Sequence, residues 1–290
     1  MNEYSKIVDT LLPHGPFDAV GIGIINFTKK CIEIKEIDHP YYDLASLTKP
    51  LTNSLSYFLK PEAFTPDMLL CLNHRGGLPA WGLLPNPGWK EQILKYPIKE
   101  SETLYSDFSA LRVMLELEKK GIDQKELCKK VWDKETVFWT DLPPDAKTLH
   151  TGFKKGEPNF GAVHDPNAWT IEEFCSHAGV YSTVNGLCQT LLNYEAETGF
   201  IQKVKKDLSL HSHRFALGWD RVINPNESLA GKGCGPNTFG HLGFTGTSIW
   251  IDPDRNLGHV ILTNATKYHW FDKQVLNELR RAIGELVWSK

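Results

Sequence analysis

Short stretches rich in apolar, β-forming residues lie near both ends of the chain, with turn-forming residues between them. Residues 19–25 and 31–37 predict two β-strands, joined by a hairpin turn at residues 26–29. Residues 247–251 and 259–263 predict a second hairpin around a turn rich in aspartate and proline. The pattern therefore predicts antiparallel strands contributed by both ends of the chain.

A longer periodicity predicts helices at the two termini. Residues 4–12 form an amphipathic helical pattern that ends before Pro13. Near the other end, apolar residues recur at helical spacing and predict a final helix: Val275, Leu276, Leu279, Ile283, Leu286 and Val287. Residues 46 to about 184 read as helical and loop-rich, with clusters of proline and glycine at residues 78–89 and 142–159.

Together these patterns predict an α+β fold. An antiparallel β-sheet from both chain ends is flanked by the terminal helices, and a helical lobe is inserted between the two halves of the sheet. We place the sheet-containing lobe at residues 1–45 and 185–290 and the mainly helical lobe at residues 46–184, as parts of one continuous unit. A chain of 290 residues is long enough to bury such a core.

The stretch Ser46-Leu47-Thr48-Lys49 places a hydroxyl one helical turn from an amine. Residues three apart on a helix share a face, so Ser46 and Lys49 can touch if a helix begins here. Pro50 supports that start, because proline is tolerated in the first turn of a helix but not further in. Serine is a poor nucleophile at neutral pH, and a desolvated lysine is one base that activates it. The same pattern also arises by chance in surface helices, so its meaning depends on what accompanies it.

Two further motifs follow in order. The tripeptide Y-S-D at residues 105–107 precedes an apolar helical pattern, and H-L-G at residues 241–243 opens the last strand-rich segment. With Ser46 and Lys49, these motifs resemble the serine β-lactamase and penicillin-binding-protein superfamily, on its class C and esterase side. That family carries S-x-x-K, Y-x-N, and K-T-G or H-x-G in this order. The resemblance runs from about residue 19 to the C-terminus, includes an L-x-H-x-S-G-L-P-like loop at residues 72–79, and implies the β-lactamase/transpeptidase-like fold.

The resemblance implies roles for these residues. Ser46 is the expected nucleophile and Lys49 its base, while Tyr105 helps to move the serine proton to the leaving group. His241 replaces the lysine of β-lactamases, as in esterase and peptidase members of the family. The plainer alternatives are a tyrosine that only packs in a core or turn and a histidine at a strand edge with no chemical role.

Three more residues complete the expected substrate site. Gly243 lacks a Cβ, so a substrate can lie flat against the strand, and the N–H of Phe244 with that of Ser46 then forms an oxyanion hole. Asp107 stands where the family has asparagine. Its carboxylate either pairs with Lys49 and keeps the amine protonated, or orients an amine of the substrate.

Residues 161–168 and 176–182 resemble runs found in one branch of the family, V-H-D-x-N-A and G-H-A-G-L-F-S, respectively. That branch includes enzymes assigned to removing peptide from N-acetylmuramic acid. His164 and Asp165 are candidates to line a cleft, and structural support is the alternative for both His164 and His177. A metal site built from these three side chains matches no typical ligand spacing, so we predict no metal and no other cofactor.

The segment between Ser46 and Tyr105 is shorter than is usual in the family. The trimmed helical lobe predicts a more open cleft, which favours a large, polymer-derived substrate or a partner that completes the site. Several tryptophans are candidates to stack on a sugar ring, although core packing is the commoner role for this residue: Trp81, Trp89, Trp169, Trp219 and Trp270.

Composition argues against several classes of protein. A net charge of −3 with no long run of one sign gives no electrostatic support for nucleic-acid binding. No segment reaches the roughly 18–20 apolar residues of a membrane span, and the first residues lack the features of a signal peptide. The six scattered cysteines contain no C-x-x-C pair, so we predict free thiols in a reducing cytoplasm. A cytoplasmic location favours neither a β-lactamase nor a transpeptidase, which generally work outside the membrane.

The sequence thus predicts a serine hydrolase that works through an acyl-enzyme on an ester or amide, such as a muropeptide fragment of a cell wall. Its partner is then a small-molecule, peptide or glycopeptide substrate, and the sequence does not determine the oligomeric state. The alternative is a non-catalytic binding or regulatory protein on the same scaffold, which Asp107, the short lobe and the predicted cytoplasmic location favour. The presence of Ser46, Lys49 and Tyr105 together favours the enzyme, because a binding protein has no need of that set.

Overall fold

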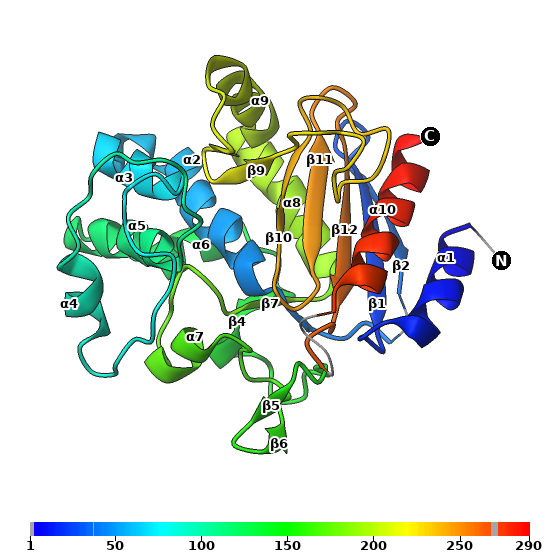
Figure 1. Ribbon diagram of the computed structural model, residues 1–290, viewed down its shortest axis with the longest axis horizontal. Helices are drawn as coiled ribbons and strands as arrows, with labels where there is room; N and C mark the ends of the chain where they lie inside the picture. Colours follow the sequence, from blue (N-terminus) through cyan, green and yellow to red (C-terminus); the bar gives the residue numbers. More distant parts are fainter. Residues whose placement is uncertain (1–2, 37, 268–271) are drawn as a thin grey trace.

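The computed structural model describes residues 3–36, 38–267 and 272–290. Within these residues the main sheet has seven antiparallel strands in the order β2-β1-β12-β11-β10-β9-β8 (Figure 1). The strands are β1 (Val20–Asn26), β2 (Cys31–Lys35), β8 (Phe215–Ala216), β9 (Trp219–Arg221), β10 (Phe239–Leu242), β11 (Ser248–Asp252) and β12 (Leu257–Thr263). The two predicted hairpins are β1–β2 and β11–β12. Ile37, the predicted end of the second strand, lies outside the described residues.

The two ends of the chain meet inside this sheet. β1 pairs antiparallel with β12, with Ile22 opposite Ile261, so a strand from the start of the chain lies beside one from its end. Both strands are buried at nearly every position, because helices cover both faces of the sheet. The predicted antiparallel sheet built from both chain ends is confirmed.

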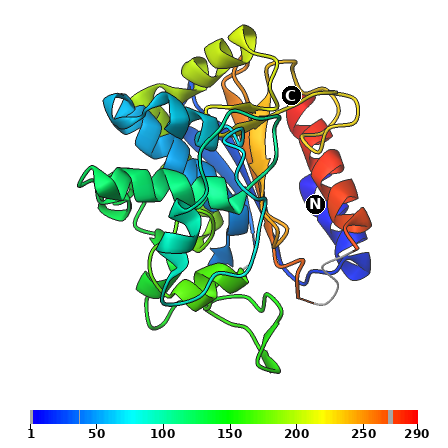
Figure 2. The same cartoon turned by 60° about the vertical axis from the view of Figure 1, so that its left-hand side comes forward.

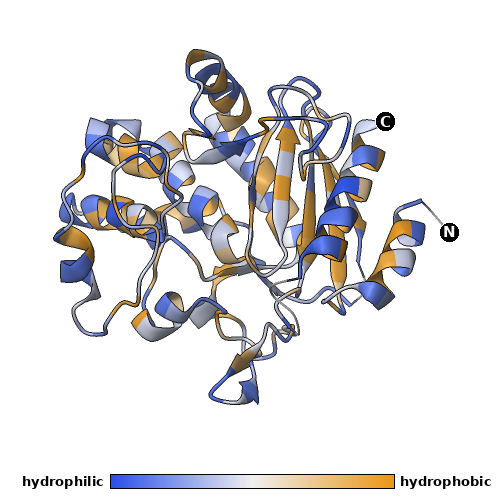
Figure 3. Cartoon of the chain, in the orientation of Figure 1, coloured by the Kyte–Doolittle hydropathy of each residue, from blue (hydrophilic) through white to orange (hydrophobic). Residues whose placement is uncertain are grey.

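Helices α1 and α10 lie side by side against one face of the sheet, and α8 lies against the other (Figures 1 and 2). Their bounds are α1 (Glu3–Leu11), α8 (Val184–Thr198) and α10 (Gln274–Trp288). The buried apolar residues of α10 recur every three or four positions and so share one face of the helix: Leu276, Leu279, Ile283 and Val287. In Figure 3 the central strands are mainly hydrophobic and α10 carries hydrophilic residues along its visible side. The predicted flanking terminal helices are confirmed.

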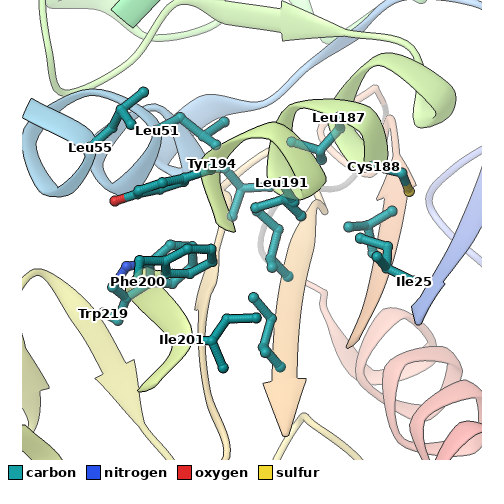
Figure 4. Close-up of a cluster of buried hydrophobic side chains, with 14 of the residues drawn as sticks. Ile25, Leu51, Leu55, Leu187, Cys188, Leu191, Tyr194, Phe200, Ile201 and Trp219 are labelled. Atoms are coloured by element: carbon teal, nitrogen blue, oxygen red, sulfur yellow. The ribbon is translucent and has the colours of Figure 1, made fainter. Parts of the chain in front are cut away.

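The largest core lies between α8 and the sheet (Figure 4). Leu191 and Tyr194 of α8 are fully buried there, and the ring of Phe200 stacks on that of Tyr194 with centroids 4.1 Å apart. Leu51 and Leu55, from the helical segment after Ser46, enter the same core. Full burial of a leucine side chain stabilises a protein by about 1.5–3 kcal/mol. The main core therefore anchors the segment that carries Ser46.

The inserted region contains most of the remaining helices and a second core on α5. The remaining helices are α2 (Leu55–Leu59), α3 (Pro66–Leu72), α4 (Trp89–Leu94), α5 (Asp107–Lys119), α6 (Gln124–Lys129), α7 (Pro166–Ile171) and α9 (Phe200–Leu210). The second core packs Phe108 and Leu111 of α5 against α3 and α4. The division of the chain into two lobes at residues 45 and 185 stays a prediction.

Two small sheets beside the main sheet were not predicted from the sequence. One has the order β3 (Tyr42–Asp43), β7 (Val180–Ser182), β4 (Thr136–Phe138), and the other pairs β5 (Phe153–Lys154) with β6 (Glu157–Pro158). Strands of two or three residues are too short to show an alternation of apolar and polar positions. β8 and β9 were missed for the same reason.

Two further sequence expectations concern membranes and thiols. Among the described residues, no helix combines the length and apolarity that crossing a membrane requires. All six cysteines are free thiols, with Cys31 exposed and the other five buried.

Candidate active site

The segment that carries Ser46 is a helical run of changing pitch. It begins as a 3₁₀ turn at Ala45–Leu47, widens to a π-helical turn at Pro50–Ser54 and continues as α2. Pro50 has no N–H to donate to the carbonyl of Ser46, four residues earlier, so a regular α-helical turn cannot form there. The predicted helix start is correct to within one residue, but its first turns are not α-helical.

Lys49 lies at the centre of the polar contacts around Ser46. Its Nζ is 3.0 Å from Ser46 Oγ, 3.0 Å from the carbonyl oxygen of His177 and 2.7 Å from Asp107 Oδ1. Burial alone would lower the pKa of Lys49. The Asp107 carboxylate and the Tyr105 phenol outweigh burial and hold that pKa above its ordinary value. Lys49 is therefore an ammonium at neutral pH, and of the two roles predicted for Asp107 the structure has the ion pair.

The three acceptors around Lys49 accommodate both of its protonation states. The ammonium has three N–H donors, one for each acceptor. The neutral amine has two donors and one lone pair. Because the carbonyl of His177 and the carboxylate of Asp107 can only accept, the lone pair is then left for the hydroxyl of Ser46 or for the phenol of Tyr105, which also interacts with the amine. A neutral Lys49 therefore has a lone pair within hydrogen-bond distance of the Ser46 hydroxyl.

Tyr105 lies just before α5 and covers Lys49. Lys49 Nζ is 4.9 Å from the centre of the Tyr105 ring, and the phenol interacts with both the Lys49 amine and the Ser46 hydroxyl. Burial raises the pKa of Tyr105 against the opposing effect of Lys49, so the phenol keeps its proton at neutral pH. His74 packs its ring 4.6 Å from that of Tyr105 and accepts the N–H of Ser106 at 3.1 Å. The three predicted catalytic side chains are thus gathered in one cluster.

The local sequence explains why α5 begins at Asp107. The hydroxyl of Ser106 accepts the N–H of Ser109 and caps the helix. The carboxylate of Asp107 in the first turn is favoured by the helix dipole. The N–H of Asp107 donates to the carbonyl of Ala80 at 2.8 Å, which ties α5 to the loop that precedes α4. The cap therefore orients Tyr105 before the helix and Asp107 at its start.

A cavity of about 580 Å³ opens at Ser46. Its lining comes from the segment that carries Ser46, the loop before α4, the beginnings of α5 and α7 with the residues before them, the loop before β7 and the turn after β10: Ala45, Ser46, Trp81, Tyr105, Asp107, His164, Asp165, Pro166, His177, Ala178 and Phe244. Most of this surface is apolar, and its two carboxylates each pair with a buried cation. The cavity therefore presents little net charge to a substrate at its floor.

The tryptophans named as sugar-stacking candidates have different fates. Trp81 lines the cavity and is 49% exposed. Trp89 and Trp219 are buried in the cores, and Trp169 packs against Lys154, whose Nζ is 4.9 Å from its ring centre. Trp270 lies outside the described residues. Trp81 is thus the candidate that the described structure places at the cavity.

His241 is not among the described residues that line the cavity. It is 2% exposed on β10, and its Nδ1 donates to the carbonyl of Leu242 at 2.9 Å, since a carbonyl can only accept. Burial and the charge of Lys49 lower the pKa of His241 to about 3, so the ring is neutral. The cation that β-lactamases carry at this position is therefore replaced by an uncharged, buried side chain.

Gly243 is also absent from the lining, and the packing around it gives a separate reason for a glycine at this position. A Cβ at this position would collide with the side chain of Thr247 and the carbonyl oxygen of Leu44. The protein's own packing therefore requires a glycine here, and the role predicted for Gly243 towards a substrate stays a prediction. Phe244, the next residue, does line the cavity and is 39% exposed.

His177 and Asp165 form an ion pair at the cavity wall. His177 is fully buried, and its Nε2 donates to Asp165 Oδ1 at 2.9 Å. Burial lowers the pKa of His177, but Cys175 and Asp165 outweigh burial and raise that pKa well above its ordinary value. The carbonyl oxygen of His177 accepts a hydrogen bond from Lys49 Nζ, so His177 supports the site through its backbone.

His164 occupies a different position from His177. It lines the cavity, stacks on Phe244 with ring centroids 5.5 Å apart, and its Nδ1 donates to the carbonyl of Thr151 at 2.6 Å. The described residues contain no group of three or more side chains that could hold a metal ion.

Asp43 was not singled out by any sequence pattern. Its carboxylate is buried and accepts the backbone N–H groups of Ala45 and His164. An acidic residue in an extended segment carries no sign of a partner 121 positions away. Only the folded chain shows that Asp43 belongs to the site.

Comparison with known proteins identifies relatives of this chain. A model of the family described as Beta-lactamase matches residues 72–282. An N-acetylmuramyl-L-alanine amidase from Bacillus subtilis (strain 168) is 38% identical over 116 residues, which cover 36% of this chain and 26% of that protein. A putative D-alanyl-D-alanine carboxypeptidase from Salmonella gallinarum is 29% identical over 242 residues, which cover 67% of this chain and 56% of that protein. The chain thus spans from about a quarter to just over half of the length of these relatives.

Solved structures share the fold along nearly the whole chain. A class C beta lactamase from Rhodobacter sphaeroides aligns with a TM-score of 0.68 at 13% identity and covers 99% of both chains. Simvastatin synthase from Aspergillus terreus aligns with a TM-score of 0.65 at 13% identity, covering 99% of this chain and 94% of the other. The predicted fold class is confirmed. Because the family model matches well over half of the chain, the protein belongs to the beta-lactamase family.

Proposed function

We propose that this protein is a serine hydrolase that forms an acyl-enzyme on Ser46 with an ester or amide substrate. The observation that carries the proposal is the 3.0 Å contact between Ser46 Oγ and Lys49 Nζ, beside the Tyr105 phenol and at a cavity. A nucleophile within hydrogen-bond reach of a base that a third group orients is the arrangement of activated serines. The family match begins at residue 72, so the roles of Ser46 and Lys49 depend on this geometry.

The proposed reaction begins from neutral Lys49. The amine accepts the hydroxyl proton of Ser46 as Oγ attacks the substrate carbonyl, and the N–H groups of Ser46 and Phe244 stabilise the resulting oxyanion. Tyr105 donates its proton to the leaving amine or alcohol and regains one from Lys49. Water then attacks the acyl-enzyme, giving one proton back to Ser46 through Lys49 and releasing the carboxylic acid.

The cavity and the relatives favour an amide of a cell-wall peptide as the substrate. The two relatives described above are named as an amidase of N-acetylmuramyl-L-alanine and a carboxypeptidase of D-alanyl-D-alanine. At the cavity, Trp81 offers an aromatic face to a sugar ring. A peptide fragment also carries carboxylates, and these need cations near the entrance.

Two half-buried lysines stand beside cavity-lining residues. Lys154 Nζ donates to the carbonyl of His164 at 3.1 Å, and Lys273 Nζ lies 4.7 Å from the ring centre of Phe244. Burial lowers the pKa of both lysines, and in the described part of the chain neither has a carboxylate within ion-pair distance. Their placement suits the carboxylates of a peptide substrate.

Covalent labelling tests the proposed function. A fluorophosphonate probe is expected to label the wild-type protein. Ser46→Ala should abolish labelling, whereas Ser101→Ala, which removes a serine outside the cavity lining, should not. A folded wild-type protein that the probe leaves unlabelled would refute the proposal and favour a non-catalytic binding protein.

Turnover assays then test the substrate. Hydrolysis of muramyl peptides supports an amidase, and hydrolysis of p-nitrophenyl esters alone supports an esterase. Turnover of nitrocefin with neither of these would contradict the proposed substrate class while leaving the Ser46 mechanism in place.

A further inference from the structure

Ala45, the residue before Ser46, has a left-handed backbone conformation. Its φ is +47°, in a region that residues with a Cβ rarely adopt. Backbone strain of this kind persists only where the surrounding structure imposes it. Some group in the fold must therefore restrain Ala45, and with it the direction in which the Ser46 side chain leaves the backbone.

The carboxylate of Asp43 supplies this restraint. Its Oδ1 accepts the N–H of Ala45 at 2.8 Å, and its Oδ2 accepts the N–H of His164 at 2.6 Å. Asp43 is 1% exposed, and a hydrogen bond inside a protein is stronger than one in water because the local dielectric constant is low. One buried side chain thereby joins the segment that carries Ser46 to the cavity wall that carries His164.

The backbone of Asp43 and its neighbour also holds the turn that carries Phe244. Thr245 Oγ1 donates to the carbonyl of Asp43 at 2.6 Å, and Thr247 Oγ1 donates to the carbonyl of Leu44 at 2.9 Å. The turn is thus attached to the same two residues that precede Ala45. The turn that carries Phe244 is therefore fixed to the chain just before Ser46.

We propose that Asp43 is a positioning residue for acyl transfer, whose carboxylate places Ser46 relative to the Phe244 turn and to the cavity wall at His164. The inference rests on the proposed function of Ser46. Asp43 touches neither substrate nor reacting atoms and transfers no proton. Asparagine cannot replace it, because the amide NH₂ would face one of the two backbone N–H donors and only one hydrogen bond would remain.

The test compares Asp43→Asn with Asp252→Asn. Asp252 is a matched control, because it is also 1% exposed and also accepts backbone N–H groups, those of Gly235, Asp254 and Arg255. It lies at the end of β11 and is not among the residues that line the cavity. Both substitutions should lower thermal stability. Only Asp43→Asn should lower kcat, by about 100-fold with KM nearly unchanged, since a displacement of about 1 Å costs that much.

A glycine at residue 45 separates positioning from a general loss of structure. Glycine adopts a positive φ without a Cβ penalty, so it needs the Asp43 hydrogen bond less than alanine does. Adding Ala45→Gly to Asp43→Asn should restore about tenfold of the lost kcat, the equivalent of the cost of this conformation for alanine. No restoration would overturn the proposed restraint.

Two controls keep the outcomes distinct. If fluorophosphonate does not label the wild type at Ser46, the proposed function fails, and the role of Asp43 fails with it. If the wild type is labelled but Asp43→Asn has the kcat of Asp252→Asn, the role of Asp43 alone is refuted. Should Asp43→Asn not fold, Thr245→Val removes only the hydroxyl that holds Asp43 and keeps the side-chain shape. Its kcat should fall with KM unchanged, and an unaltered kcat would overturn the inference.

Discussion

Asp107→Asn is expected to shift the pH dependence of Ser46 acylation towards lower pH. In the wild type the Asp107 carboxylate lies 2.7 Å from Lys49 Nζ and stabilises the ammonium, so the neutral amine forms only at high pH. Asparagine keeps an oxygen that can accept an N–H but removes the charge. Because the charged form of Lys49 then loses its main support, its proton should leave at lower pH.

The geometry of the pair sets the size of this shift. Two unit charges 2.7 Å apart interact by about 6 kcal/mol at an effective dielectric constant of about 20. This corresponds to about 4 pH units, since one unit is worth about 1.4 kcal/mol. Solvent reaches the Asp107 side chain, which is 17% exposed, and the asparagine retains a hydrogen bond. We therefore expect a shift of about 1–3 pH units, the usual effect of a neighbouring opposite charge.

The assay is the rate of fluorophosphonate labelling, or kcat/KM for a p-nitrophenyl ester, measured across the pH range. The wild-type rate should rise with pH as Lys49 loses its proton, and the same rise should occur at lower pH in Asp107→Asn. Glu116→Gln, which removes a carboxylate paired with Arg112 further along α5, is the matched control and should leave the profile unchanged. If the rates of Asp107→Asn and of the wild type rise over the same pH range, deprotonation of Lys49 does not control the reaction.

Four further predictions follow from the same site. Asp107→Asn should lower the free energy of unfolding at neutral pH by up to about 3–5 kcal/mol. Because the pKa of Lys49 is raised on folding, the difference in stability between wild type and variant should shrink above about pH 10.4. Denaturation curves at alkaline pH that show the same difference as at neutral pH would contradict this prediction. Tyr105→Phe should lower kcat by about 10²–10⁴-fold for amides but much less for p-nitrophenyl esters, whose leaving group needs no proton, so equal losses would argue against a proton donor. Lys273→Met should raise KM for a carboxylate-bearing ester at low salt but not KM for its neutral analogue. Lys29→Met is the surface control. If Lys273→Met and the wild type have the same KM for the charged ester, Lys273 does not contact the substrate. His241→Gln should leave the dependence of the reaction rate on pH unchanged between about pH 5 and 8, since a histidine with a pKa of about 3 is already neutral there. A change of rate with pH in that range that the wild type shows and the variant lacks would mean that the His241 ring titrates.

The spacing of apolar residues along the chain is enough to predict the main architecture. The strands of the hairpins β1–β2 and β11–β12 are rich in apolar, β-forming residues and are bounded by turn residues, and the helices α1 and α10 carry apolar residues at helical spacing. Elements of two or three residues, such as β3 and β5, have no room for such a spacing. Their conformation comes from pairing with distant segments, as Asp43 does with Tyr181.

The chemistry of the candidate site divides in the same way. Ser46, Lys49, Tyr105 and Asp107 could be named from the sequence, because the hydroxyl, amine, phenol and carboxylate occur in recognisable local motifs. Whether Asp107 pairs with the amine or waits for a substrate could not be decided from the motif. The structure decided it, because the charge state of Lys49 depends on how close α5 approaches the segment that carries Ser46 and Lys49.

Other properties of the site exist only in the folded chain. The carbonyl that completes the shell of Lys49 comes from His177, 128 positions away, and Asp43 meets His164 over a similar separation. Burial removed His241 from the cavity surface, although its motif is as clear as that of Ser46. The sequence by itself determined which functional groups are available and the order in which they occur. The tertiary structure decided their exposure, their partners and their protonation, because solvent access and electrostatic energy depend on distance in space rather than on distance along the chain.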